Sequence, residues 1–526
     1  RDTDRIHVVE RVNGERIYNE FPANYVFYYD DPKGKHRTIY GTPVTRFSTR
    51  NGKEFHKEKK IQGSGKRLWE SDVNVVYRSL SEHYLGATAP KLQTCFFDIE
   101  VDFDPLKGFS PPSDPFNKIT AITVYLDWLD KLITLAIPPK GMSWEEAQSI
   151  ANQFDDTFMF TDEADMLDQF LNLIDDADIL SGWNSEGYDI PYTVLRINRV
   201  LSKDDTRRFC LWGQYPKKRT FERFGAENVT FDLIGRVHLD YMQLYRKYTY
   251  EERHSYSLDA IGEYELDERK TAYEGTLDQL YNQDFKTFIE YNRQDTALLH
   301  KLDQKLKFLD LANELAHDNT VLLPTTMGAV AVTEQAIINE AHQLGRIVPN
   351  RASRDEQVST QAAGAYVAQP KKGMHNWVGA IDINSLYPSA IRALNMGPET
   401  VVGQLRPIMT DSYLNEKRDA GKSFTDSWDG LFATLEYTAV MEMQAGTEIT
   451  VDWENGESTV HTGAELWKML FDSNTSWILS ANGTIFTYEK KGIIPGLLER
   501  WYAERKELQA KKKDATDKED IAFWDK

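Results

Sequence analysis

The segment Cys95-Phe-Phe-Asp-Ile-Glu-Val101 places two carboxylates among apolar side chains. Because successive side chains of a strand point to opposite faces, the predicted strand carries Asp98 and Glu100 on the same face. The apolar neighbours indicate that these acids lie at the edge of a buried region, where an uncompensated carboxylate is costly. A divalent cation with oxygen ligands, Mg²⁺ or Mn²⁺, would offset that cost. A solvent-facing strand with two ordinary acids is the alternative interpretation.

The surrounding sequence predicts an α/β or α+β domain over roughly 90–310. Two further strands are expected at 118–125 and 132–137. Apolar residues at helical spacing predict helices over 163–174 and 284–311. A sequence in which strands come first and helices lie between them is typical of a sheet packed against helices.

The flanking regions follow different patterns. Residues 1–90 are expected to form short strands and turns, and a helix is predicted over 327–345. The polar stretch 351–357 marks a boundary, and Val378-Gly-Ala-Ile-Asp-Ile383 predicts another buried strand. From Ile493 the pattern is helical again.

Composition excludes several classes of protein. The chain has 526 residues, so three or four domains are expected, and 41% hydrophobic with 27% charged residues is the balance of a soluble globular protein. A net charge of -20 excludes a basic, histone-like protein, although a local basic surface can still bind nucleic acid. No apolar run reaches the length of a membrane helix. Two cysteines indicate reduced thiols, neither a disulfide scaffold nor a zinc module.

Two later segments carry acids of the same kind. In Ser181–Tyr192 a short strand and a turn lead to a helix at Asp189, which is either a site residue or a helix cap. In Tyr291-Asn-Arg-Gln-Asp295 the phenol and the carboxylate share a helix face, which is otherwise an ordinary solvated face. Taken with the first segment, four carboxylates from a strand, a helix start and a long helix can hold two metal ions about 4 Å apart.

Asp382-Ile-Asn-Ser-Leu-Tyr-Pro-Ser389 forms another candidate site. It follows the predicted strand 378–383 and turns into a helix near Pro388, a residue suited to the first turn. Asp382 at the strand end could bind a metal or merely cap the turn, and N–H groups at the helix start could hold phosphate oxygens. Tyr387 could form a floor under a ribose ring.

Together these motifs resemble the family B DNA polymerases, and specifically the replicative polymerases of T-even-type bacteriophages. Three exonuclease motifs of the family correspond to Phe97–Glu100, Asn184–Asp189 with Pro191-Tyr192, and Tyr291 with Asp295. The first polymerase motif corresponds to 382–389, preceded by Gly364-Ala-Tyr-Val367. Segments 255–260, 397–400 and 492–506 also match.

The resemblance implies an RNase H-like 3'–5' proofreading exonuclease over residues 93–310. Asp98, Glu100, Asp189 and Asp295 would bind two Mg²⁺ ions, with Mn²⁺ possible, and Tyr291 would position the water. Residues 1–92 and 311–357 would form an N-terminal domain. Part of the palm would occupy 358–490, and the helical fingers would begin over 491–526.

The resemblance also implies roles in a polymerase site. Asp382 and the carbonyl of Ile383 would bind metal, and the N–H groups of Ser385 and Leu386 would contact the nucleotide triphosphate. Tyr387 would act as a steric gate against a 2'-hydroxyl. The fingers residues that would grip the triphosphate are Arg505 and Lys506.

Several features depart from the family pattern. After the 382–389 motif the Lys-x3-Asn-Ser-x-Tyr-Gly and Asp-Thr-Asp motifs of the family do not occur, and Asp-Thr-Asp supplies the second palm carboxylate. Gln509 stands where a basic residue is expected, and residues 405–480 are longer than the family pattern. An initiator Met and a first strand are also missing. We therefore expect either a segment of a longer polymerase or half of a split one, which needs its missing C-terminal half to extend DNA.

The expected partners are primer–template DNA and dNTP, together with a sliding clamp and a single-stranded DNA-binding protein. The expected location is the cytoplasm of an infected bacterial host, with no membrane association. Two alternatives remain open, a free-standing metal-dependent exonuclease and a non-enzymatic nucleic-acid-binding module. All four exonuclease carboxylates are present, and a binder has no need for four acids facing a phosphate backbone, which disfavours the binding module. The 385–389 turn disfavours a simple exonuclease.

Overall fold

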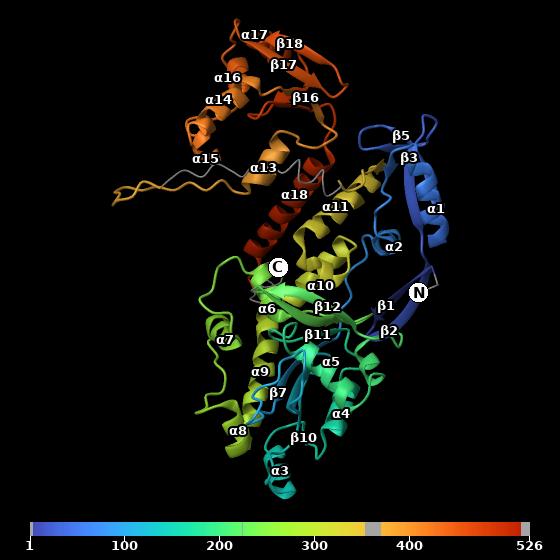
Figure 1. Cartoon of the computed structure of the whole chain (residues 1–526), viewed down its shortest axis with the longest axis vertical. Helices are drawn as coiled ribbons and strands as arrows, with labels where there is room; N and C mark the ends of the chain where they lie inside the picture. The colour runs from blue at the N-terminus through green and yellow to red at the C-terminus, as the bar shows by residue number, and fades with distance from the viewer. Residues whose placement is uncertain (1–3, 224, 353–369, 517–526) are drawn as a thin grey trace. The chain divides into compact units, whose positions relative to one another are not determined.

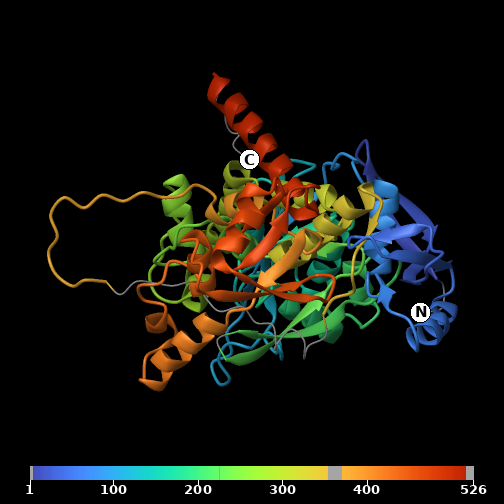
Figure 2. The ribbon, with the colours of Figure 1, turned by 90° about the horizontal axis from the view of Figure 1, so that it is seen from above.

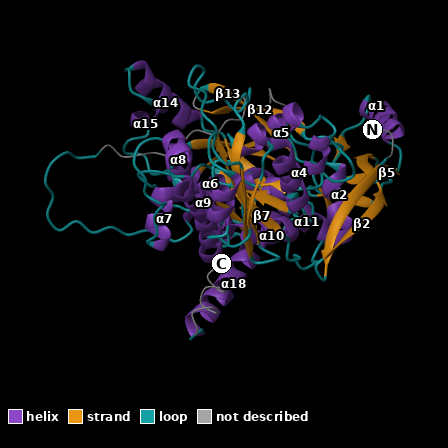
Figure 3. Cartoon of the chain, turned by 90° about the horizontal axis from the view of Figure 1, so that it is seen from below, coloured by secondary structure: helices purple, strands orange, loops and turns teal. Residues whose placement is uncertain are grey.

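The computed structural model describes residues 4–223, 225–352 and 370–516. The chain divides into two compact units, Arg1–Asn24 with Val75–Gln335 and Tyr25–Asn74 with Ala336–Lys526 (Figure 1). Both units combine helices with strands (Figure 3). The predicted mixed α/β, multidomain fold is confirmed. Within the described ranges, no helix is long and apolar enough to span a bilayer.

A six-stranded mixed sheet is the centre of the first unit, in the order β10-β9-β8-β7-β11-β14. Its strands are β7 (Thr94–Val101), β8 (Ile119–Leu126), β9 (Lys131–Ala136), β10 (Thr157–Met159), β11 (Ile179–Ser181) and β14 (Val237–His238). Strand β7 pairs antiparallel with β8 and parallel with β11, so it lies inside the sheet. The three predicted strands are confirmed, and the acids of β7 are in the interior of the sheet.

Helix α9 (Phe285–Leu306) packs across β7 and β8 (Figure 3). Its apolar face is buried at the spacing that the sequence predicts. The prediction that this helix continues to residue 311 is wrong. Lys307 takes a left-handed conformation with φ 54°, and its N–H closes the last turn on the Asp303 carbonyl at 2.7 Å. A separate helix, α10 (Phe308–Asp318), follows.

Shorter elements complete the first unit. An antiparallel hairpin near the start of the chain and a second one in the middle flank the sheet. The elements are β1 (Arg5–Val12), β2 (Glu15–Pro22), α2 (Val75–Tyr84), α3 (Trp144–Ala151), α4 (Glu163–Leu173), α5 (Asp189–Val200), β12 (Lys217–Arg223), β13 (Ala226–Asp232), α6 (Tyr241–Tyr248), α7 (Leu258–Leu266) and α8 (Leu277–Gln283). Helix α11 (Ala329–Gln343) leads from the first unit into the second.

The second unit contains a five-stranded sheet in the order β15-β4-β5-β3-β6. The elements of this part are β3 (Tyr25–Asp30), β4 (His36–Thr38), β5 (Pro43–Thr49), α1 (Gly52–Gly63), β6 (Leu68–Trp69) and β15 (Arg346–Ile347). Strand β15 returns to pair with β4 after more than 300 intervening residues. Buried Glu70 accepts hydrogen bonds from His342 at 2.8 Å and from the Val348 N–H at 3.0 Å, which fixes that return.

A second five-stranded sheet, in the order β18-β17-β16-β20-β19, occupies the later part of this unit. Four α-helices also form between residues 406 and 470. The elements are α13 (Leu386–Ala393), β16 (Val401–Leu405), α14 (Ile408–Asp419), α15 (Phe424–Ser427), α16 (Leu435–Met441), β17 (Glu448–Trp453), β18 (Ser458–Thr462), α17 (Gly463–Trp467), β19 (Trp477–Leu479), β20 (Thr484–Thr487) and α18 (Ile493–Asp514).

The predicted buried strand 378–383 does not form. Residues 370–383 run as an arc without helix or strand (Figure 2). Val378 and Ile381 are 77% and 98% exposed. A strand needs neighbours that pair its N–H and C=O groups and cover its apolar face. The described residues provide no such neighbour for this segment, so its apolar character alone does not make it a strand.

Candidate metal centre

The alternation of β7 brings Asp98 and Glu100 to one face of the sheet. They pair in register with Thr123 and Ala121 of β8, at the centre of the hydrogen-bonded ladder. Glu100 is buried and Asp98 is half-buried. Strand β8 therefore pairs with the backbone that carries both acids, whereas β11 pairs with β7 only at Thr94–Phe96.

Helix α9 contributes the next two side chains. Asp295 is 3% exposed and Asn292 is fully buried. The Asn292 amide donates to Asp98 Oδ2 at 2.9 Å, and its own Oδ1 accepts from the Thr123 hydroxyl at 2.5 Å. This chain of hydrogen bonds from β8 through Asn292 fixes the orientation of the Asp98 carboxylate.

Asp98, Glu100 and Asp295 converge. One carboxylate oxygen from each lies within 4.8 Å of the other two, and no other such cluster of three His, Cys, Asp or Glu occurs in the part of the chain that the structure describes. Burial raises the pKa of Glu100 to about 8, with the charge of Asp295 adding to the effect. Burial and the neighbouring acids also raise the pKa of Asp98 well above its usual range. The raised pKa values show that the acids repel one another and that the nearby Lys270 ammonium offsets only part of that repulsion.

Asp295 supplies a direct test of whether this cluster fits a cation. Its Oδ2 pairs with the Lys270 ammonium, but its buried Oδ1 has no hydrogen-bond partner. A buried carboxylate oxygen without a donor is unfavourable, and hard divalent cations bind such oxygens. The donor set of three carboxylates, together with this unpartnered oxygen, fits Mg²⁺ or Mn²⁺.

Asp189 lies near these acids but outside their 4.8 Å group. It is the first residue of α5 and is buried, and burial raises its pKa to about 7. The N–H of Ile99 in β7 stabilises its carboxylate, and its charge raises the pKa of Asp98. The structure therefore brings three of the four predicted carboxylates into one cluster and puts the fourth beside it.

The turn that precedes α5 is held from β14 and α6. Asp240 accepts from the N–H groups of Asn184 at 3.0 Å and Glu186 at 3.1 Å, and His238 Nε2 lies 2.8 Å from the Ser185 hydroxyl. A Cβ atom on Gly182 would lie only 2.9 Å from the Phe97 carbonyl oxygen. Glycine is therefore required for the turn to pass so close to β7, which brings Asp189 near Asp98.

Lys270 is a site residue that the sequence analysis missed. Its ammonium pairs with Asp295 and donates to the Tyr291 hydroxyl at 3.2 Å. Burial alone would lower the pKa of Lys270, but the charges of Asp295 and Asp98 outweigh it and raise the pKa. Lys270 lies in the loop between α7 and α8, where its N–H bonds Asp259 at 2.8 Å. A single lysine in a loop belongs to no periodic sequence pattern, so the sequence alone gave no indication that Lys270 is part of the site.

The predicted polymerase residues lie in the second unit, and the structure does not assemble them into a cluster. Asp382 and Ile383 precede α13, and both are exposed. Ser385 has a left-handed backbone with φ 52°, and α13 begins at Leu386, two residues earlier than predicted. Tyr387 is 73% exposed. The segment Gly364–Val367 lies outside the described residues.

Helices α13 and α18 pack together, which brings the 382–389 motif near the predicted fingers residues. The Arg392 guanidinium of α13 lies 4.4 Å from the centre of the Tyr502 ring of α18, and the Lys506 ammonium lies 5.5 Å from the same ring. Arg505 and Lys506 are both exposed on α18. Both side chains are accessible to a ligand.

Comparison with known proteins agrees with this division of the chain. Residues 54–261 match the model of the DNA polymerase family B exonuclease domain, and residues 325–526 match that of DNA polymerase family B. Because the two models together cover most of the sequence, the chain belongs to DNA polymerase family B.

Similar proteins include the DNA-directed DNA polymerase of Escherichia phage RB69, 28% identical over 403 residues, which are 72% of this chain and 44% of that protein. The DNA-directed DNA polymerase of Enterobacteria phage T4 is 28% identical over 249 residues, 47% of this chain and 27% of that protein. The DNA polymerase of Paramecium bursaria Chlorella virus NY2A is 28% identical over 269 residues, 46% and 28% of the two chains. The chain spans less than half the length of these curated relatives.

Proposed function

We propose that the metal centre is the active site of a 3'–5' exonuclease that hydrolyses the terminal phosphodiester of DNA and releases a 5' deoxynucleotide. The observation that carries this proposal is the convergence of Asp98, Glu100 and Asp295 around an unpartnered oxygen. The family B exonuclease model, which matches residues 54–261, supports the same reaction.

Asp98, Glu100 and Asp295 would hold Mg²⁺, with Asp189 as a fourth carboxylate and Mn²⁺ as an alternative ion. Two such ions, when bound, stabilise charge on the phosphoryl oxygens and lower the pKa of a water. Asn292 holds Asp98 in one orientation through its amide. The protein thereby provides a fixed set of oxygen ligands.

Tyr291 and Lys270 act on the same side of the centre. Burial, together with the charge of Asp295, raises the pKa of Tyr291, so its phenol stays protonated at neutral pH. Lys270 donates to the phenol oxygen, which leaves the phenol O–H to donate to another acceptor. We infer that this O–H orients the attacking water, while the Lys270 ammonium offsets part of the negative charge of the acids and the phosphate.

We further propose that the second unit carries part of a polymerase site. In this proposal Asp382 and the Ile383 carbonyl bind metal, and the N–H groups of Ser385 and Leu386 hold the triphosphate of a dNTP. Helix α13 has no side chain that caps its start, which supports an anion-binding role for these groups. Tyr387 would exclude a 2'-hydroxyl, and Arg505 and Lys506 would grip the triphosphate.

This polymerase site needs a second carboxylate segment. Two-metal phosphoryl transfer uses acids from two motifs, and no Asp-Thr-Asp follows the 382–389 motif in this sequence. We propose that the complementary half, on the same gene product or a separate chain, supplies it. Primer–template DNA, a sliding clamp and a single-stranded DNA-binding protein remain proposed partners, and the cytoplasm of an infected bacterium remains the proposed location.

The domain boundaries also remain a proposal. They are 1–92 and 311–357 for the N-terminal domain, 93–310 for the exonuclease, 358–490 for the palm and 491–526 for the fingers.

The test uses a 3'-labelled single strand and a primer–template, each incubated with the chain, Mg²⁺ and dNTPs beside the Asp98→Ala variant. We expect shortening that disappears in the variant, and no extension in either lane. Thermal melting of both proteins excludes loss of the fold as the cause. Shortening that persists in Asp98→Ala would refute the exonuclease centre, and extension by the chain alone would refute the need for a second segment.

A further inference from the structure

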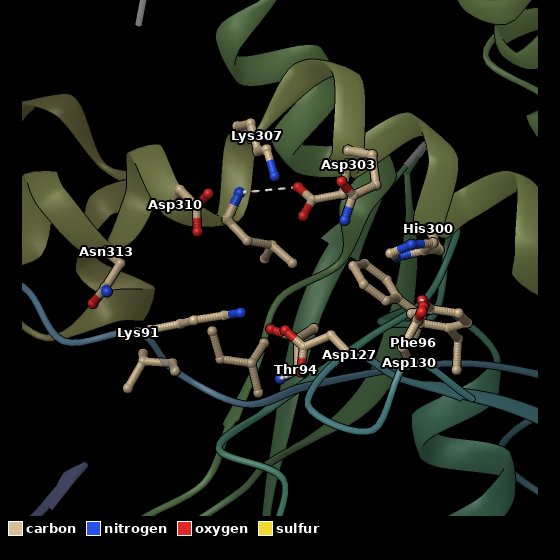
Figure 4. Close-up of a pocket in the computed structure, with 15 residues that line it drawn as sticks. Lys91, Thr94, Phe96, Asp127, Asp130, His300, Asp303, Lys307, Asp310 and Asn313 are labelled. Atoms are coloured by element: carbon tan, nitrogen blue, oxygen red, sulfur yellow. Dashed lines mark hydrogen bonds between the residues drawn. The ribbon is translucent and has the colours of Figure 1, made fainter. Parts of the chain in front are cut away.

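The first unit contains a cavity of about 410 Å³ that shares no lining residue with the metal centre (Figure 4). It lies at the start of β7, where Thr94 and Phe96 line it, whereas Asp98 and Glu100 follow further along the strand. The other walls come from the loop after β8, the end of α9 and the start of α10. A volume of this size can hold a small organic ligand.

Acids outnumber bases in the lining. Four aspartates face two lysines, Lys91 and Lys307, and the cavity also contains His300 (Figure 4). Burial lowers the pKa of His300 to about 4, so its ring is neutral at neutral pH. Neither lysine makes an ion pair within 4.0 Å among the described residues. The cavity therefore carries net negative charge. The aspartates are Asp127, Asp130, Asp303 and Asp310.

Asn313 has a buried side-chain oxygen that accepts no hydrogen bond. It is 8% exposed, and its amide nitrogen donates to the Pro90 carbonyl at 2.7 Å, but its buried Oδ1 has no partner. The Nδ1 atom of His300 is also buried without a partner. Buried polar groups of this kind are normally hydrogen-bonded, and each one left unsatisfied is unfavourable. An N–H donor from a ligand would satisfy the oxygen of Asn313.

The carboxylates are spread along the cavity and do not converge on a point. No three of them come within the 4.8 Å that brings Asp98, Glu100 and Asp295 together. A single metal ion, which needs several oxygens at one point, does not match this arrangement. An extended cation with separated charges does match it. Apolar side chains also line the cavity and would cover aliphatic carbons, among them Leu92, Ile179 and Leu309.

We propose that this cavity binds a linear aliphatic polyamine. Its ammonium groups lie against the aspartates and the Asn313 oxygen, and its methylene segments lie against the apolar side chains and the Tyr125 ring, which stacks on His300 at 3.7 Å. Desolvation raises the pKa of Asp127 and of Asp303 to about 6, and the charges of Lys91 near Asp127 and of Lys307 near Asp303 offset only part of that rise. This proposal does not depend on the exonuclease function, because the two sites share no residue.

The test is a calorimetric titration of spermidine into the full chain. The Asp98→Ala background is used so that the metal centre does not compete for the amine. Asp310→Asn removes one charge from the lining, and Glu314→Gln removes one charge from an exposed position of the same helix outside the lining. Both changes alter the net charge equally, so general attraction to an acidic protein affects both variants alike.

We expect one spermidine site per chain, with affinity weakened about 5-fold or more by Asp310→Asn and less than about 2-fold by Glu314→Gln. Asn313→Leu, which fills the cavity with apolar atoms, should abolish the binding in a protein that melts normally. Equal weakening in the two charge variants would overturn the proposal, and so would the absence of a saturable site. Displacement of spermidine by Mg²⁺ in preference to a salt of equal ionic strength would also overturn it, because it would indicate a site for a point charge.

Discussion

Glu100 and Asp295 in the first unit are 8% and 3% exposed, whereas Ile383, next to Asp382 in the second unit, is 60% exposed. Both regions begin from the same type of sequence, an apolar strand-like segment with an acid at its end. Strand β7 has β8 and β11 beside it, and α9 covers it. The 378–383 segment has no strand beside it among the described residues.

The difference shows that an acidic strand motif specifies a site only together with the elements that cover it. The acids of β7 are held by backbone pairing, by Asn292 and by Lys270. Asp382 has an anchored helix after it but nothing that holds the backbone before it. The acids of the proposed exonuclease site thus come together among the described residues, whereas those of the proposed polymerase site do not.

The largest expected effect separates the two regions directly. Asp98→Ala should slow the shortening of a 3'-labelled strand by about 10³-fold, which corresponds to about 4 kcal/mol of barrier. Asp382→Ala should leave that rate unchanged within about 2-fold. Single-turnover rates in Mg²⁺ provide the measurement. A comparable loss in both variants would mean that the two regions form one site.

A second prediction concerns backbone exposure. Trypsin should cut after Lys371 or Lys372, which lie in an exposed segment without regular structure, about 100-fold faster than at Lys118 or Lys131 beside β8. Mass spectrometry of timed digests gives the order of cleavage. Cleavage at 118 or 131 at the same rate would show that the central sheet is no better protected than the 370–383 arc.

Lys270 sharpens the description of the metal centre. Lys270→Met should slow strand shortening about 30-fold, mainly through kcat, because the ammonium that contacts Asp295 and Tyr291 is lost. Lys301→Met, which breaks an exposed pair with Glu268, serves as the matched control and should change the rate by less than about 2-fold. If both variants slow strand shortening equally, Lys270 has no specific role in the metal centre.

The smallest expected effect is on stability without metal. Burial raises the pKa of Glu100 from 4.5 to about 8, so the folded state binds the extra proton between these values and wild-type stability falls as pH rises through this range. In EDTA at pH 8.5, Glu100→Gln should therefore melt a few degrees higher than wild type. The difference in melting temperature between Glu100→Gln and wild type should become smaller toward pH 5.

Glu290→Gln, an exposed position on α9, is the control for this experiment and should follow the wild-type melting curve. If Glu100→Gln melts below wild type at pH 8.5 in EDTA, repulsion among the acids of the cluster does not destabilise the metal-free protein. Saturating Mg²⁺ should reverse the order, because wild type then gains a ligand that the variant binds less well.

The sequence was sufficient to predict the elements that contain the acids. The alternation in 95–101 predicted β7, and the helical spacing in 284–306 predicted the buried face of α9. Both patterns arise from local periodicity that packing then satisfies. Asp98, Glu100 and Asp295 were predicted to meet, and the structure brings them together.

Other features depend on interactions that no local pattern records. The end of α9 at Lys307 needs a left-handed residue that nothing in its identity demands. Lys270 reaches Asp295 from a loop 25 residues earlier, and Asp240 reaches the 184–186 turn from more than 50 residues later. The failure of the 378–383 strand has the same origin, because a strand depends on partners elsewhere in the chain.

The return of β15 to the sheet of β3–β6 has a consequence for how the chain folds. Trp69 bridges Pro349, and the Ser71 N–H bonds Asn350 at 2.8 Å, so these contacts close a loop of about 280 residues. Closing a flexible loop of that length costs considerable entropy before any contact repays it. If residues 75–335 collapse into their own unit first, the effective loop becomes short.

During synthesis the sheet stays one strand short until residue 347 has left the ribosome, by which time the sequence of the entire first unit is already available to fold. Completion of the β15-β4-β5-β3-β6 sheet therefore depends on the order in which the chain is synthesised. The β15 strand completes its sheet only after the intervening first unit has had its opportunity to form.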